Sequence, residues 1–243
     1  PENAFCSRGY NGATSSLERV ILPEGMITIE EDAFQNCNNL SSIIIPSSII
    51  SMDKDAFSTC SSLTTAGPIG GDYDIQFGWQ DEIPESAFCD SALVSVTIPK
   101  GITSIGAYAF KWCRDLTYIS IPEGVSIIGD NAFESCDKLI SIAIPSSVTT
   151  IGRRAFYSCD NLENITISEN VTAIEDETFR GCSNLTSILI PESVTEMGVD
   201  VFAECSSLIS MGPIGGNYNI QVEWEKFPSF FFSKMGLADI IQS

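Results

Sequence analysis

The chain has 243 residues, of which 44% are hydrophobic and 18% charged, and this balance favours a continuous core and excludes intrinsic disorder. Its 32 acidic and 12 basic residues give a formal net charge of −20, which disfavours binding to nucleic acid or anionic lipid. No apolar run approaches the length of a membrane-spanning helix, and the lack of histidine excludes Ser/His/Asp and Cys/His catalytic sites.

A 23-residue sequence repeat recurs along the chain. Its marker is a phenylalanine, usually preceded by alanine, which returns at this constant interval in two runs: Phe34 and Phe57, then Phe110, Phe133, Phe156, Phe179 and Phe202. A fixed period of this length is typical of a solenoid, in which each coil packs mainly on its neighbours. We therefore expect a single solenoid over residues 1–243 and, since both ends fall within a repeat, a fragment of a longer array.

Each repeat is expected to begin with a strand of the pattern L-x-x-I-x-I-P. Its apolar residues alternate with period two, and the proline, which lacks an N–H donor, ends it. In chain order the predicted strands are 17–23, 40–46, 93–99, 116–122, 139–145, 162–168 and 185–191. A turn such as P-E-G follows, then two apolar positions in V-x-x-I-G, then a turn or single helical turn that carries A-F-x-x-C.

The glycine after the second apolar position is not expected to require a positive φ. Four repeats have glycine there, but other repeats have an acidic residue instead, namely Glu30, Asp53 and Glu175. Because residues other than glycine are accepted there, the site is not expected to need the conformational freedom of glycine.

Seven of the nine cysteines stand three residues after a repeat phenylalanine, and Cys6 and Cys89 stand one residue after theirs. The chain has no C-x-x-C pair and no histidine, which disfavours zinc binding. We interpret the seven as a column of reduced, buried thiols that stack as small hydrophobic side chains. Disulfides between neighbouring coils are the alternative.

Two insertion cassettes, at 66–83 and 211–227, break the period. Each contains G-P-I-G-G followed by alternating aromatic and aliphatic residues, which predicts an edge or hairpin strand. Their aromatic residues either pack a hairpin onto the solenoid or present a platform for sugar or peptide: Tyr73, Trp79, Tyr218 and Trp224.

The consensus L-x-x-I-x-I-P-x-x-V-x-x-I-G-x-x-A-F-x-x-C resembles the BspA-like, or Treponema-type, leucine-rich repeat over nearly the whole chain. The resemblance implies an α/β leucine-rich-repeat solenoid that is β-rich and right-handed, with a parallel sheet on the concave face. It also implies a secreted or cell-surface location and a role in adhesion, with host matrix proteins or other surface proteins as partners. The two cassettes depart from the family pattern.

Two surfaces are candidates for contact with a partner. The outward strand positions are mostly serine and threonine, which either bond an extended partner or simply suit exposed strands. The second candidate is a basic and aromatic cluster, mostly after the phenylalanines, that stacking in register should bring together. Its residues are Tyr108, Lys111, Trp112, Arg114, Tyr118, Arg154, Tyr157 and Arg180. Interleaved acids such as Glu134 and Asp137 would alternatively neutralise it.

These patterns together predict a non-enzymatic, extracellular recognition solenoid whose concave and edge surfaces bind a protein partner, with no metal and no cofactor. The acidic run Glu30-Glu31-Asp32 lacks the spacing of a calcium loop. A glycan-binding accessory protein and a purely structural spacer are the alternatives.

Overall fold

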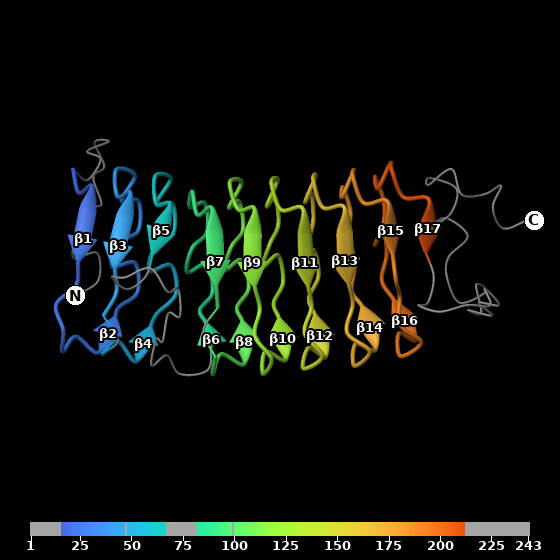
Figure 1. Ribbon diagram of the computed structural model, residues 1–243, viewed down its shortest axis with the longest axis horizontal. Coiled ribbons are helices and arrows are strands. Elements are labelled where there is room, and N and C mark those ends of the chain that lie inside the picture. Colours follow the sequence, from blue (N-terminus) through green and yellow to red (C-terminus); the bar gives the residue numbers. More distant parts are fainter. Residues whose placement is uncertain (1–15, 47, 67–81, 99, 212–243) are drawn as a thin grey trace, which may run out of the picture.

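The computed structural model describes residues 16–46, 48–66, 82–98 and 100–211. The central part of each cassette lies outside these ranges, with Tyr73, Trp79, Tyr218 and Trp224, so the hairpin predicted there stays a prediction. The described residues form a stack of similar coils, each with two short strands and a turn, and contain no helix (Figure 1). The predicted leucine-rich-repeat solenoid is therefore confirmed, and the A-F-x-x-C segment is a turn rather than a helical turn.

The first strand of each coil comes from the L-x-x-I-x-I segment, as predicted, but is only two or three residues long. Neighbouring strands run parallel and are offset by one repeat in sequence, so that Val20 pairs with Ile43 and Ile142 with Ile165. This row, the upper one in Figure 1, consists of β1 Arg19–Ile21, β3 Ser42–Ile44, β5 Thr65–Ala66, β7 Ser95–Thr97, β9 Tyr118–Ser120, β11 Ser141–Ala143, β13 Asn164–Thr166, β15 Ser187–Ile188 and β17 Ser210–Met211.

A second, shorter strand, which the sequence pattern did not predict, comes from the V-x-x-I segment. Ile128 pairs in parallel with Ile105 in the preceding coil and with Ile151 in the following coil. This lower row consists of β2 Thr28–Ile29, β4 Ser51–Met52, β6 Glu82–Ile83, β8 Ser104–Ile105, β10 Ile127–Ile128, β12 Thr150–Ile151, β14 Ala173–Ile174 and β16 Glu196–Met197. Each coil is thus closed by two parallel strand rows.

The turn around each phenylalanine carries a third ladder of hydrogen bonds between coils. Around Phe110, the backbone N–H groups of Tyr108, Phe110 and Trp112 donate to carbonyl oxygens of the next coil at N–O distances of 2.9, 2.8 and 2.7 Å. The equivalent three bonds join every successive pair of coils from Phe34 to Phe202, including the pair that flanks residues 67–81. All of these N–H groups point toward the C-terminal end, so their peptide dipoles add along the array, unlike those of a sheet.

Left-handed backbone conformations make this ladder possible. The residues two before and two after the phenylalanine have φ near +60°, for example 60° at Tyr108 and 62° at Trp112. Most coils place aspartate, asparagine, serine or glycine there, and asparagine, aspartate and glycine tolerate this conformation best. The turn geometry therefore has a sequence signature, although the period alone does not reveal it.

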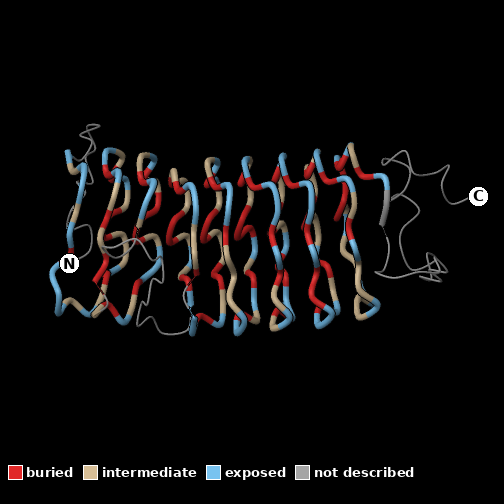
Figure 2. The backbone as a smooth tube through the Cα atoms, in the orientation of Figure 1, coloured by how far each residue is buried: buried red, intermediate tan, exposed pale blue. Residues whose placement is uncertain are grey.

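Buried residues recur at corresponding places in successive coils (Figure 2), and their side chains form a core that runs along the array. The rings of eight phenylalanines from Phe34 to Phe202 stack with centroids 5.1–5.6 Å apart and interplanar angles of 1–9°. Phe57 and Phe88, which flank the first cassette, stack like the others, at 5.6 Å and 6°. The core is therefore continuous across that cassette.

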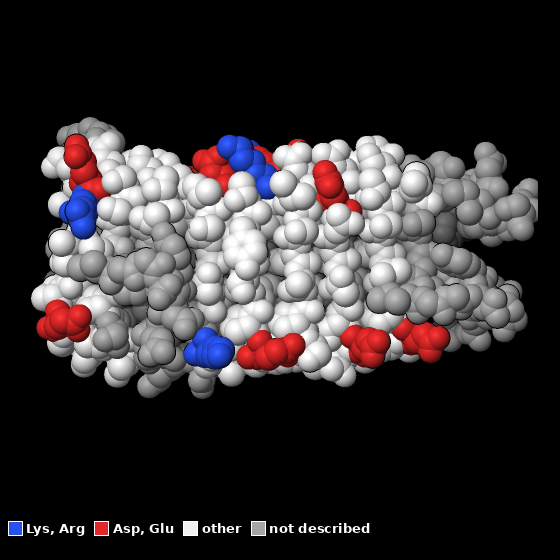
Figure 3. Space-filling model, viewed as in Figure 1, with Lys and Arg blue, Asp and Glu red and all other residues white. Residues whose placement is uncertain are grey.

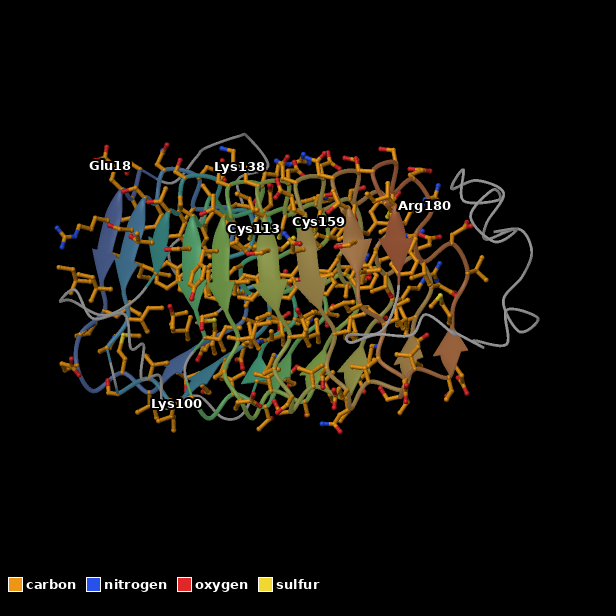
Figure 4. All side chains as sticks on the ribbon, turned by 45° about the vertical axis from the view of Figure 1, so that its right-hand side comes forward. Glu18, Lys100, Cys113, Lys138, Cys159 and Arg180 are labelled. Atoms are coloured by element: carbon orange, nitrogen blue, oxygen red, sulfur yellow. The ribbon has the colours of Figure 1, made fainter. Side chains whose placement is uncertain are left out.

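The cysteine column lies beside the phenylalanines. Cys113 and Cys159 lie in the interior of the coils (Figure 4), and both are buried and free. In the coil of Cys89, the buried Ser91 takes the column position, and its Oγ atom lies 3.3 Å from the sulfur of Cys113. Cys37 is disulfide-bonded, so the interpretation of all seven column cysteines as reduced is wrong at this position, and the free thiols of the column begin at Cys60.

The repeat glycine is needed for close contact between coils rather than for its φ. Gly129 is not among the residues with a positive φ, as expected from the sequence. A Cβ atom on Gly129 would lie 2.7 Å from the backbone nitrogen of Ala107 and 2.8 Å from the carbonyl carbon of Gly106. The backbones of successive coils are therefore in direct contact here.

Candidate partner-binding surfaces

Three predicted site residues lie together on the turn face, which we define as the residues that flank each repeat phenylalanine. The Nζ atom of Lys111 lies 5.2 Å from the ring centroid of Tyr108 and 4.6 Å from that of Trp112. It also pairs with the carboxylate of Glu134 in the next coil at 3.1 Å. Only 17% of the lysine side chain is exposed, so its ammonium group is held by two rings and one carboxylate.

Arg154, Tyr157 and Arg180 form a second group on the turn face, two to three coils further along. The guanidinium of Arg154 lies 5.3 Å from the ring centroid of Tyr157 and donates from Nε to Glu177. This hydrogen bond holds the pKa of Glu177 below its ordinary value. Arg180 pairs with Glu204 at 2.7 Å. Each cation of this group thus has a carboxylate partner.

The structure does not bring the remaining two predicted residues into these groups. Arg114 is an exposed side chain that pairs with Asp137 of the next coil at 3.2 Å. Tyr118 begins β9, and its residue is 56% exposed on the strand side of the coil. The chain turns between Arg114 and Tyr118, so proximity in sequence does not place them on one face.

Ion pairs between neighbouring coils neutralise the basic side chains of the turns. They join Lys54 to Glu31, Lys111 to Glu134, Arg114 to Asp137, Lys138 to Asp115, Arg154 to Glu177 and Arg180 to Glu204. Each of these pairs links one coil to its neighbour. The basic charge of the predicted cluster is consequently compensated and does not by itself attract an acidic partner.

The strand face, formed by the outward residues of the first strand row and the residue before each strand, is nearly free of charge. Charged side chains gather along its two long edges (Figure 3), where Lys138 lies at the upper edge and Lys100 at the lower edge (Figure 4). Glu163 is the acidic residue among the outward positions of β7 to β15. On a chain with a net charge of −20, a face with so few charges is a distinctive surface.

Uncharged polar side chains on the strand face fall into two sets. Those just before a strand donate to a carbonyl oxygen of the preceding coil, as Thr117 does to Val94 at 3.0 Å. Within the described ranges, the side chains on the strands themselves make no hydrogen bond at Ser95, Ser141 and Asn164. The first set serves the fold, and the second set is available to a partner.

Three exposed apolar residues from consecutive coils lie near the middle of the strand face. Val94 is 44%, Tyr118 56% and Ile140 51% exposed. Tyr118 pairs in register with Ser95, the residue after Val94, and β11 begins one residue after Ile140. We call these three residues the strand-face patch. The sequence signal for Val94 and Ile140 is an aliphatic residue at the position that Ser41, Thr64 and Thr117 occupy in their own coils.

The described ranges contain no group of three or more histidine, cysteine, aspartate or glutamate residues arranged to hold a metal ion. Nor does the same part of the chain contain a helix long and apolar enough to cross a membrane.

Two parallel strand rows, a 23-residue step and a column of Leu, Ile and Phe define the protein as a leucine-rich-repeat solenoid. The chain belongs to the BspA type leucine rich repeat family, whose repeat matches residues 7–67 and 81–209 in six copies. No curated protein matches the chain.

Solved structures with the same fold come from several bacteria. The chain is 28% identical to the Treponema pallidum leucine rich repeat protein TpLRR, with a TM-score of 0.57 over 79% of this chain and 78% of that one. The pneumococcal vaccine antigen PcpA is 18% identical, with a TM-score of 0.56 over 81% of this chain and 60% of the antigen, and this likeness concerns the fold alone.

Proposed function

We propose that the protein is a cell-surface or secreted recognition solenoid that binds a protein partner through the strand face. The observation that carries the proposal is the strand-face patch, in which Val94, Tyr118 and Ile140 are exposed on a surface with few charged side chains. Its extracellular location and a role in adhesion are part of the proposal and are supported by the family to which the chain belongs.

The anatomy of this face suits a protein interface. Such interfaces have an apolar centre, often with an aromatic anchor, and a polar rim that is depleted of charge near the core. Here the three apolar residues are bordered by Ser95, Ser141 and Asn164, whose side chains have no hydrogen-bond partner within the described coils. The exposed Glu163, whose N–H donates to the carbonyl oxygen of Ile140 at 2.9 Å, adds one charge to this border. A partner that covered the patch would bury its apolar surface and satisfy these polar groups.

A neutral glycan is the second candidate ligand. An exposed tyrosine ring bordered by hydroxyl groups can stack on one face of a sugar and bond its hydroxyls. The carboxylates at the edges disfavour anionic glycans, so an uncharged chain would fit best. Glycan binding depends on Tyr118 and its polar neighbours, whereas a protein interface would also use Val94 and Ile140.

Surface plasmon resonance on the immobilised chain tests the proposal. The analytes are fibronectin, fibrinogen and laminin on one side and a panel of neutral oligosaccharides on the other. We expect binding of at least one of the proteins and a loss of about tenfold or more in affinity for Tyr118→Ser. Tyr157→Ser, on the turn face, is the matched control and should bind like the wild type.

If the chain binds only oligosaccharides, and Tyr118→Ser abolishes this binding, the ligand of the strand face is a glycan rather than a protein. Equal loss in both tyrosine variants, or no binding of any analyte, would contradict recognition by the strand face.

A further inference from the structure

A second binding surface lies on the turn face at Trp112. In the other described coils, the position two residues after the phenylalanine has left-handed φ and holds asparagine, threonine, aspartate, serine, glycine or glutamate. Trp112 has a φ of 62° and is 40% exposed. A bulky side chain in this conformation is unfavourable, and such outliers concentrate at functional sites.

One side of the Trp112 ring already receives a cation. The ammonium of Lys111 lies 4.6 Å from its centroid, and the same ammonium pairs with Glu134. Tyr108 contacts the ammonium as well, with its centroid 5.2 Å away. Because Lys111 is neutralised and only 17% exposed, it holds the indole ring in place without making the surface basic. We call Tyr108, Lys111 and Trp112 the tryptophan platform.

The turn face N-terminal to the platform is rich in carboxylates, whose charge Lys54 offsets only in part. Asp90 occupies the same column one coil earlier, and its N–H donates to the carbonyl of Lys111 at 2.7 Å. Asp55, Glu85 and Asp90 make no ion pair within the part of the chain that the structure describes. Partial burial and then repulsion by Asp32 raise the pKa of Asp55, and the opposing effect of Lys54 is smaller.

We propose that the tryptophan platform and the neighbouring Asp90 bind an arginine side chain of a polypeptide partner. An exposed indole ring beside a carboxylate attracts a guanidinium, which stacks on the ring and donates to the oxygens. The negative charge of the adjacent coils selects a basic segment over an acidic one. The site is separate from the strand face, and it does not rest on the function proposed above.

Fluorescence anisotropy with a labelled nonapeptide that alternates arginine and glycine tests the proposal at low ionic strength. We expect Trp112→Asn to weaken binding about tenfold or more, and Asp90→Asn to weaken it less. Glu123→Gln removes the same charge as Asp90→Asn but from an exposed position on another turn, and should change affinity less than about twofold. A nonapeptide of glutamate and glycine should not bind.

The stability of Trp112→Asn separates a binding role from a structural one. Asparagine occupies the equivalent position at Asn36, so the variant should melt no lower than the wild type while it loses the arginine peptide. Undiminished binding by Trp112→Asn would overturn the proposal. So would equal losses in Asp90→Asn and Glu123→Gln, because binding would then reflect overall charge. Retained binding by Tyr118→Ser would show that the site is independent of the strand face.

Discussion

The thiol of Cys159 donates a hydrogen bond to the carbonyl oxygen of Phe133 in the preceding coil, with sulfur and oxygen 3.1 Å apart. The same bond joins Cys136 to Phe110 and other cysteine–phenylalanine pairs along the column. This repeated geometry explains why a thiol, rather than a plain aliphatic group, recurs at this position. The folded coil requires the protonated form, because a thiolate cannot donate.

The cysteine column predicts a loss of stability at alkaline pH. Burial raises the pKa of the Cys60 and Cys113 thiols to about 12, above the value of about 8.5 for an unfolded thiol. A raised folded-state pKa means that the stabilisation is complete below about pH 8.5 and is lost as the pH rises toward 12. The free energy of unfolding, measured by urea titration, should therefore fall above about pH 9.

Replacement of Cys136 and Cys159 by alanine provides the control for that prediction, because both thiols are buried in the column. The double variant should start less stable and should lose less stability between about pH 8.5 and 11 than the wild type. An identical alkaline slope in both proteins would show that other groups cause the effect.

The phenylalanine stack predicts a large cost for removing one ring. Phe133 is fully buried between Phe110 and Phe156, whose centroids lie 5.5 and 5.4 Å away. Phe133→Ala should lower the free energy of unfolding by about 3–5 kcal/mol in urea titrations. The control Ser141→Ala, at an exposed strand position, should change it by less than about 0.5 kcal/mol. A loss below about 1 kcal/mol at Phe133 would argue against a tightly packed column.

The contact between coils at Gly129 predicts that any side chain there is harmful. Its Cβ atom would lie 2.7 Å from a backbone nitrogen, so Gly129→Ala should destabilise the protein by about 1–3 kcal/mol. Gly129→Asn should destabilise the protein at least as much as Gly129→Ala, because Gly129 does not have the positive φ that asparagine tolerates. Asp53→Ala, at the equivalent position of another coil, should be nearly neutral. Thermal melts of the three variants decide between steric contact and φ as the reason for glycine.

The ion pairs of Glu177 predict a loss of stability at acidic pH. Arg154 lowers the pKa of Glu177, so the stabilisation is present above about pH 4.3 and is lost as the pH falls through the lower folded-state value. Glu177→Gln should cost up to about 1 kcal/mol at pH 7 and make the acid-induced loss shallower. Glu192→Gln, an exposed change, should have no measurable effect. Equal stability of the two variants at pH 7 would mean that the turn-face pairs do not hold the coils together.

The sequence period predicted the parts of the fold that depend on repetition. The constant interval between phenylalanines identified Phe133 and its copies as a stacked column and assigned the L-x-x-I-x-I segments to strands. The second strand row was not predicted, because a strand such as Ile127–Ile128 is too short to show an alternation of apolar and polar residues. The ladder of hydrogen bonds between turns was not predicted, because it depends on the φ angles of individual residues. At Trp112 the residue type does not favour the left-handed φ that the coil imposes.

The candidate site was predicted less well than the fold. Stacking in register aligned the turns of successive coils, but the contacts of Lys111 with Tyr108 and Trp112, and of Arg154 with Tyr157, each lie within one coil. It could not reveal which carboxylate neutralises each cation, because that depends on side-chain reach across neighbouring coils. Tyr118 was predicted to belong to the same cluster as Trp112, but it begins β9 and is exposed on the strand face.

The most direct test of recognition through the strand face is the affinity of Val94→Thr/Ile140→Thr for whichever matrix protein binds the wild type most tightly by surface plasmon resonance. Thr117 occupies the same position in the coil between them, so the double variant should fold normally, which a thermal melt would verify. We predict wild-type stability with an affinity reduced about tenfold or more. A stable double variant that binds with wild-type affinity would contradict recognition through the strand face.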